Sequence, residues 1–116
     1  MVLSYGNIEA EIAKVLCELE DCAGALADAY DNDADADIAW RAKRAYLKSR
    51  EREVRLSERL PADWYDDFAT INGAPELRDH LRARAKLETL RAQRAILGAR
   101  LDGLRTLAAG VRGAGG

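Results

Sequence analysis

The sequence predicts an all-α protein of three helices, with a long antiparallel helical hairpin that packs like a coiled coil. Two stretches carry this prediction, because apolar residues recur in them at alternating steps of three and four. This spacing aligns the apolar residues along one face of a helix. No segment has the alternation of a strand, and no internal repeat is visible. A length of 116 residues fits a single helical domain, 1–116.

The first element is an acidic helix predicted at 5–30. Ser4 or Asn7 suits its N-cap, and residues 1–39 contain ten acids and one lysine. Its apolar face follows the four-three alternation, with Ile8, Ile12, Val15, Leu19, Cys22, Leu26 and Ala29.

The acidic run Asp31–Asp37 follows, and its alternating aspartates match the first half of a calcium-binding loop. The match then fails, because Ala36 stands where the loop needs glycine and Ala42 where it needs a bidentate glutamate. The run is therefore predicted to be a short polar break whose acids favour the start of the next helix.

A basic helix is predicted at 36–60 and ends before Pro61, because the residue before a proline avoids the α conformation. An aromatic loop at 61–74 follows, with a short helical turn at 63–70 that carries Trp64, Tyr65 and Phe68. Three aspartates lie among these rings, so a plug over the end of the hairpin is favoured over base stacking.

The last element is a long helix predicted at 75–111, with Pro75 in the first turn. An apolar seam continues the heptad pattern along it, and we expect this seam to form the core or an oligomer contact. The seam residues are Leu97, Leu101, Leu104 and Val111.

Catalysis, metals and cofactors are not predicted. His80 is the only histidine and has no nucleophile at helical spacing, and no glycine-rich phosphate loop is present. Cys17 and Cys22 are too few for a metal site and suit reduced, buried thiols. The absence of a signal peptide and of an apolar span predicts a cytoplasmic protein that does not enter membranes.

Charge is segregated along the chain although the net charge is only −2. Two stretches, Arg41–Arg59 and Arg82–Arg112, are basic, and a shared basic face would suit a phosphodiester backbone. The alternative is that these bases pair with the acidic helix, within one chain or between chains.

The basic helix with Trp40 and Tyr46, the aromatic loop, and a long helix closing on Leu101-Asp102-Gly103-Leu104-Arg105-Thr106 resemble small helical proteins of tailed phages. Among these, residues 38–112 resemble UvsY-type recombination mediators. The resemblance implies a homo-oligomer, expected to form a ring, that binds single-stranded DNA. Its protein partners would be a RecA-like recombinase or a single-strand-binding protein. The matching DNA-binding candidates are Lys43, Arg44, Lys48, Arg50, Arg52 and Arg55.

Three functions therefore remain open. The first is a phage recombination mediator that binds single-stranded DNA and assists recombinase loading as an oligomer. The second is a helical structural or assembly protein of a phage, such as a connector component or chaperone, without nucleic-acid binding. The third is a small acidic inhibitor that presents residues 8–37 to a host nucleic-acid-binding protein.

Overall fold

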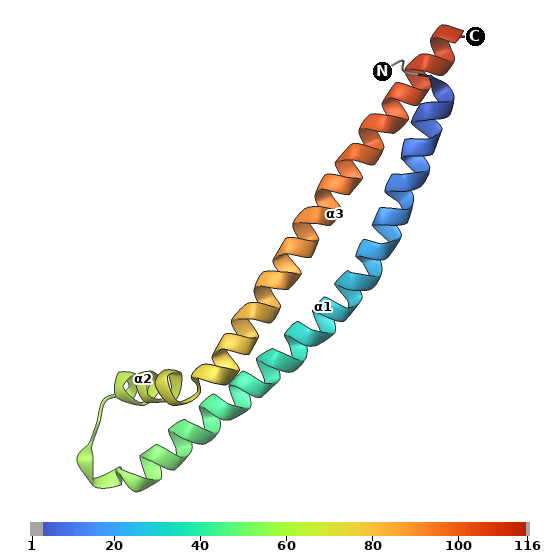
Figure 1. The fold of residues 1–116 in the computed structure, drawn as a ribbon. Coiled ribbons are helices and arrows are strands. Elements are labelled where there is room, and N and C mark those ends of the chain that lie inside the picture. The colour runs from blue at the N-terminus through green and yellow to red at the C-terminus, as the bar shows by residue number, and fades with distance from the viewer. Residues whose placement is uncertain (1–3, 116) are drawn as a thin grey trace. The chain divides into compact units, whose positions relative to one another are not determined.

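The computed structural model describes residues 4–115, and their side chains as far as residue 113. It contains three α-helices, α1 (Tyr5–Val54), α2 (Ala62–Asn72) and α3 (Ala74–Gly115), with a short 3-10 turn, η1 (Leu56–Glu58), before α2. No strand occurs in this described part of the chain. The all-α prediction with a helical hairpin is confirmed (Figure 1).

The contacts divide the chain into two compact units. Unit 1 comprises Met1–Asp28 and Glu88–Gly116, and unit 2 comprises Ala29–Leu87. Each unit therefore contains a segment of α1 and a segment of α3, and unit 2 also contains α2. The single domain expected from the length stays a prediction.

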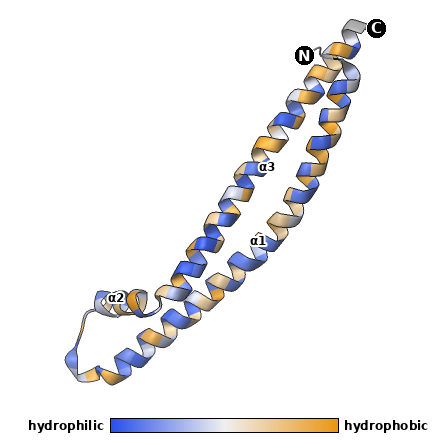
Figure 2. Cartoon of the chain, viewed as in Figure 1, coloured by the Kyte–Doolittle hydropathy of each residue, from blue (hydrophilic) through white to orange (hydrophobic). Residues whose placement is uncertain are grey.

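In unit 1, α1 and α3 run antiparallel along an apolar seam. The cross-helix pairs give the direction, since Arg100 bonds to Glu11 at 2.8 Å and Arg112 bonds to the Tyr5 hydroxyl at 2.7 Å. The buried residues continue the predicted heptad faces: Ile8, Val15, Cys22 and Leu26 on α1, and on α3 Leu101 together with Ala108, seven residues later. Apolar and polar residues accordingly alternate along both helices (Figure 2).

The structure defines the start of α1 and the end of α3 more closely than the sequence does. The Ser4 side chain is the N-cap, because its Oγ accepts a hydrogen bond from the backbone N–H of Asn7 at 3.2 Å. The prediction that the long helix ends at 111 was too short, since α3 continues to Gly115. The Arg112 guanidinium lies 5.2 Å from the centre of the Tyr5 ring, and this contact secures the last turns.

The predicted break at 31–37 is wrong, because α1 passes through the acidic run without interruption. The three-four spacing of the seam continues there, with Asp33 and Ala36 in the places of apolar residues. Asp33 is only 9% exposed, and its carboxylate accepts a hydrogen bond from Arg84 Nε at 3.0 Å. Asp37 bonds to Arg41 one turn later at 3.1 Å. These pairs remove the reason for a helix break, because partnered acids are compatible with a helix interior.

Unit 2 therefore has a polar seam where unit 1 has an apolar one. Besides the Asp33–Arg84 pair, His80 Nε2 lies 3.8 Å from Asp37, and Lys43 Nζ lies 3.9 Å from Glu76. Glu76 Oε2 and His80 Nδ1 are buried without a hydrogen-bond partner among the described residues. Six residues therefore form a polar seam in unit 2: Asp33, Asp37, Lys43, Glu76, His80 and Arg84.

The bounds predicted for the basic helix and the aromatic loop also need correction. α1 ends at Val54 rather than at residue 60, because Pro61 excludes the α conformation at Leu60 and the chain turns earlier, through η1. Arg59 completes this turn in the left-handed region, with φ 51° and ψ 47°. The segment predicted as an aromatic loop is mostly the regular helix α2.

Gly73 joins α2 to α3 at a point of close approach. A Cβ atom placed on this residue would lie 2.7 Å from Trp40 Cζ3 and 3.4 Å from Leu47 Cδ1. The absence of a side chain therefore lets the α2–α3 junction rest directly against α1. This contact positions α2 beside the basic part of α1.

Candidate nucleic-acid interface

Four basic side chains of α1 share one face in unit 2. Arg41, Arg44, Lys48 and Arg52 are spaced three, four and four residues apart, which places them along one side of a helix. Together with Ala45 and Ser49 they line a shallow groove of about 290 Å³. We call this feature the basic groove.

A carboxylate from α2 already lies against the basic groove. Asp66 Oδ1 accepts hydrogen bonds from Lys48 Nζ at 2.6 Å and from Arg44 Nη2 at 3.0 Å. The hydrogen bond from Lys48, with the nearby positive charges of Arg44 and Arg52, lowers the pKa of Asp66 below its ordinary value of 3.8. Two bases of the groove therefore converge on a single oxyanion.

This depressed pKa makes the attachment of α2 sensitive to acid. The folded state binds the Asp66 proton more weakly than the unfolded chain does, so the Asp66 contribution to stability is complete above pH 3.8. It disappears as the pH falls through the lower, folded-state pKa. We expect wild type to be more stable than Asp66→Asn at neutral pH and equal to it in strong acid. Urea unfolding of both proteins across this range measures the difference, and a constant difference would contradict the assignment.

The other three predicted DNA-binding residues do not join the groove. Lys43 is half-buried and belongs to the polar seam. Arg50 lines a different depression, together with Leu47 and Phe68.

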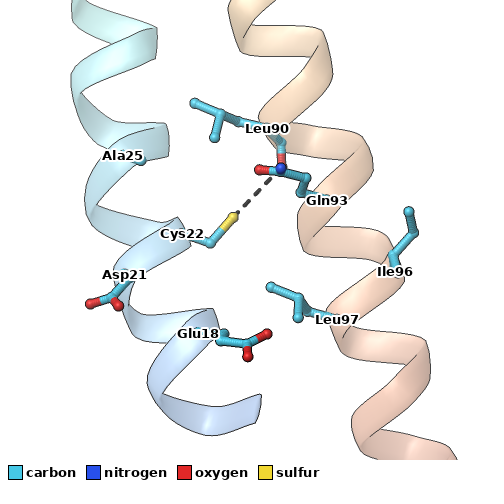
Figure 3. Close-up of a pocket in the computed structure, with 8 residues that line it drawn as sticks. All are labelled: Glu18, Asp21, Cys22, Ala25, Leu90, Gln93, Ile96 and Leu97. Carbon is cyan, nitrogen blue, oxygen red and sulfur yellow. Dashed lines mark hydrogen bonds between the residues drawn. The ribbon is translucent and has the colours of Figure 1, made fainter. Parts of the chain in front are cut away.

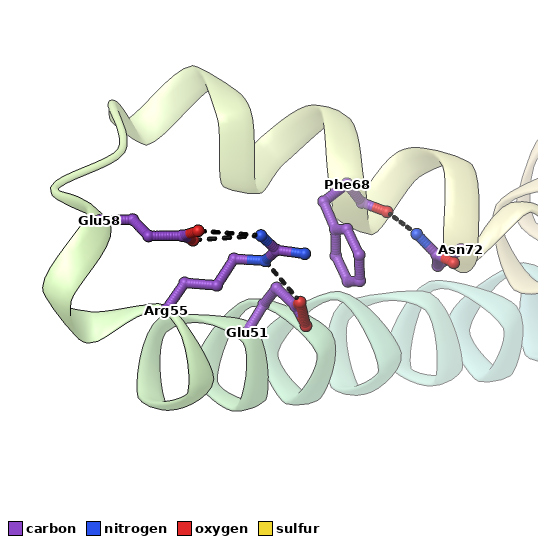
Figure 4. A network of polar contacts seen from close by, with 5 residues as sticks. All are labelled: Glu51, Arg55, Glu58, Phe68 and Asn72. Carbon is purple, nitrogen blue, oxygen red and sulfur yellow. Dashed lines mark hydrogen bonds and ion pairs between the residues drawn. The ribbon is translucent and has the colours of Figure 1, made fainter.

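The positive charge of Arg55 is neutralised by two glutamates, Glu51 of α1 and Glu58 of η1 (Figure 4). Its guanidinium donates to Glu51 at 2.9 Å and to Glu58 at 3.1 Å. These hydrogen bonds, with that to Glu51 the stronger cause, raise the pKa of Arg55. A phosphate at Arg55 would have to compete with two carboxylates, whereas Arg44 and Lys48 share only one, that of Asp66.

The aromatic residues of α2 form a small cluster next to these bases. The Trp64 and Phe68 rings are stacked, with centroids 5.4 Å apart, and Tyr65 is buried. Arg55 lies 4.9 Å from the centre of the Trp64 ring, and Arg52 lies 5.3 Å from that of Tyr65. The cluster thus packs within unit 2, in agreement with the interpretation of these rings as a plug.

One groove residue, Arg41, is missing from the predicted set although the sequence contains the signal for it. The resemblance implies DNA binding through basic residues on the helix before the loop, whereas the groove contains only those bases that share one helical face. Projection of the basic helix at 100° per residue groups Arg41 with Arg44, Lys48 and Arg52 and separates Arg50.

The predicted seam residues lie in unit 1, and the acidic run lies in unit 2. In unit 1, Leu101 is buried, and Leu97, Leu104 and Val111 are half-buried. In the acidic run, Asp33 and Asp37 are paired with bases, whereas Asp31 and Asp35 are exposed. An inhibitor that uses residues 8–37 would therefore present only part of this charge.

Comparisons of the chain with protein-family models, with curated proteins and with solved structures gave no match. Within residues 4–115, no helix has an apolar stretch long enough to cross a lipid bilayer.

Proposed function

We propose that this protein binds single-stranded DNA through the basic groove and, as an oligomer, assists the loading of a RecA-like recombinase. The observation that supports DNA binding is the pairing of Arg44 and Lys48 with the Asp66 carboxylate. Side chains that converge on one carboxylate oxygen have the spacing needed for a phosphate oxygen. Arg41 and Arg52 extend the groove by about one turn at each end.

The preference for a single strand and the role in recombination rest on the resemblance to recombination mediators. A groove on the flank of one helix also suits a flexible strand, which can follow a short track of charges. The RecA-like recombinase and the single-strand-binding protein remain proposed partners.

The test is a mass measurement in solution, with and without a single-stranded oligonucleotide, over a series of salt concentrations. Four phosphate contacts predict a slope of about −3 for the logarithm of the binding constant against the logarithm of salt concentration. Binding that does not depend on salt, or no binding at low salt, would contradict the proposal. Tighter binding to double-stranded than to single-stranded DNA would contradict the proposed preference for a single strand.

A second candidate is an assembly protein without nucleic-acid binding. It is favoured by the number of large apolar side chains that are exposed, which include Ile38, Leu56 and Ile96. The same mass measurement separates the two candidates, because an assembly protein would form oligomers and leave the oligonucleotide free.

A further inference from the structure

Unit 1 has an apolar groove on one side of its two helices (Figure 3). The groove has a volume of about 420 Å³, and Cys22 of α1 and Leu90 and Leu97 of α3 line it. Ile96 stands at its edge and is 67% exposed. Two helices alone leave this side of the seam open, because each α-helix covers only one side of the other.

The exposure of this groove is energetically unfavourable. Leu97 belongs to the heptad seam and Leu90 lies seven residues before it, yet both are only half-buried. Burial of apolar side chains removes them from water and stabilises a protein. A surface that covers Ile96 and the two leucines together would therefore contribute substantially to stability.

The charges of unit 1 indicate what covers the groove. Residues 5–28 of α1 contain six acids and one base, and residues 88–115 of α3 contain five bases and two acids. Glu18 and Asp21 lie along the α1 side of the groove. A helix that docks here must bring an apolar residue for the groove and bases for this acidic rim.

The same α3 segment has these properties. Ile96 is exposed, and the exposed base Arg94 lies two residues before it. We propose that the groove is the interface of a homodimer, in which Ile96 of each copy enters the groove of the other.

In a two-fold arrangement the same surface serves both copies, so each contact occurs twice. The basic α3 of one copy then lies against the acidic α1 of the other, and four helix segments enclose a common core. This interface specifies the oligomer of the proposed function, and it does not depend on DNA binding.

The test is the mass of the protein in the absence of DNA, by light scattering after gel filtration. Wild type is expected at twice the chain mass of 12.8 kDa, and Ile96→Glu at the mass of one chain. Ile38→Glu is the matched control, because Ile38 is 65% exposed but lies in unit 2. This control variant is expected to remain a dimer.

A cross-linking variant keeps the proposal testable if Ile96→Glu fails to fold, which circular dichroism would reveal. Ile96→Cys in a Cys17→Ser, Cys22→Ala background is expected to form a disulfide between two chains under mild oxidation, because residue 96 itself lines the groove that the partner's residue 96 enters. A wild-type monomer, an odd number of copies, a dimer that survives Ile96→Glu, or no cross-link would overturn the proposal. A wild-type monomer would also remove the oligomer from the proposed function, but none of these results decides whether the oligonucleotide binds, so failure of the interface is distinguishable from failure of DNA binding.

Discussion

Replacement of Arg44, Lys48 and Arg52 together by glutamine is expected to weaken binding of a single-stranded oligonucleotide roughly 100-fold in 0.1 M salt. Each phosphate contact on a single strand contributes about 0.7 released counterions, which corresponds to about 1 kcal/mol at this salt concentration. The salt slope should also become shallower by about 2. Fluorescence anisotropy with a labelled oligonucleotide measures both quantities.

The matched control removes three positive charges elsewhere in unit 2. Arg78, Arg82 and Lys86 are exposed on α3, and their replacement by glutamine changes the net charge by the same amount. If the basic groove is the binding site, this control should lose far less affinity. Equal losses would mean that the oligonucleotide responds to net charge alone.

A substitution of Asp66 is expected to change the affinity for the oligonucleotide in the opposite direction. Its carboxylate occupies the Arg44–Lys48 pair, so a strand that binds there must compete with it. Asp66→Asn is expected to raise the affinity roughly five-fold in 0.1 M salt, because it removes one competing charge. Unchanged affinity would place the bound strand away from these two bases.

Leu101→Ala is expected to reduce the free energy of unfolding by about 3 kcal/mol. Leu101 is buried in the seam of unit 1, so the shorter side chain loses apolar contacts and leaves a cavity. Urea unfolding followed by circular dichroism at a fixed protein concentration measures this loss.

Leu81→Ala is the control for the seam prediction. Leu81 is on the same helix, α3, but it is 58% exposed, so its truncation should cost less than about 1 kcal/mol. Similar losses at both positions would show that the seam is not the main source of stability in α3.

The helical hairpin could be predicted from the sequence because the heptad pattern directly indicates two long amphipathic helices. Val15 and Leu101 lie in the cleanest stretches of this pattern, and both are buried. The polarity of the acidic run predicts a break in α1, whereas its three-four spacing continues the helix, and the structure follows the spacing. Asp33 occupies a seam position in the sequence, but its partner Arg84 is 51 residues away, and only the folded hairpin brings them together.

The candidate site could be predicted only in part for a similar reason. The helical face shared by Arg44, Lys48 and Arg52 follows from their spacing. The contact with Asp66 does not follow from the spacing, since it depends on the orientation of α2 relative to α1. That direction is set by the left-handed conformation of Arg59 and by the close approach of Gly73 to Trp40, which no local pattern reveals.

The uninterrupted heptad spacing of α1 and α3 also restricts how the length of this protein can change during evolution. One inserted residue turns every later side chain by about 100° around the helix axis and moves the apolar residues off the seam. An insertion of three or four residues shifts the phase less, but it still forces a local change of winding. Length variants should therefore differ by whole heptads, with matching changes in α1 and α3.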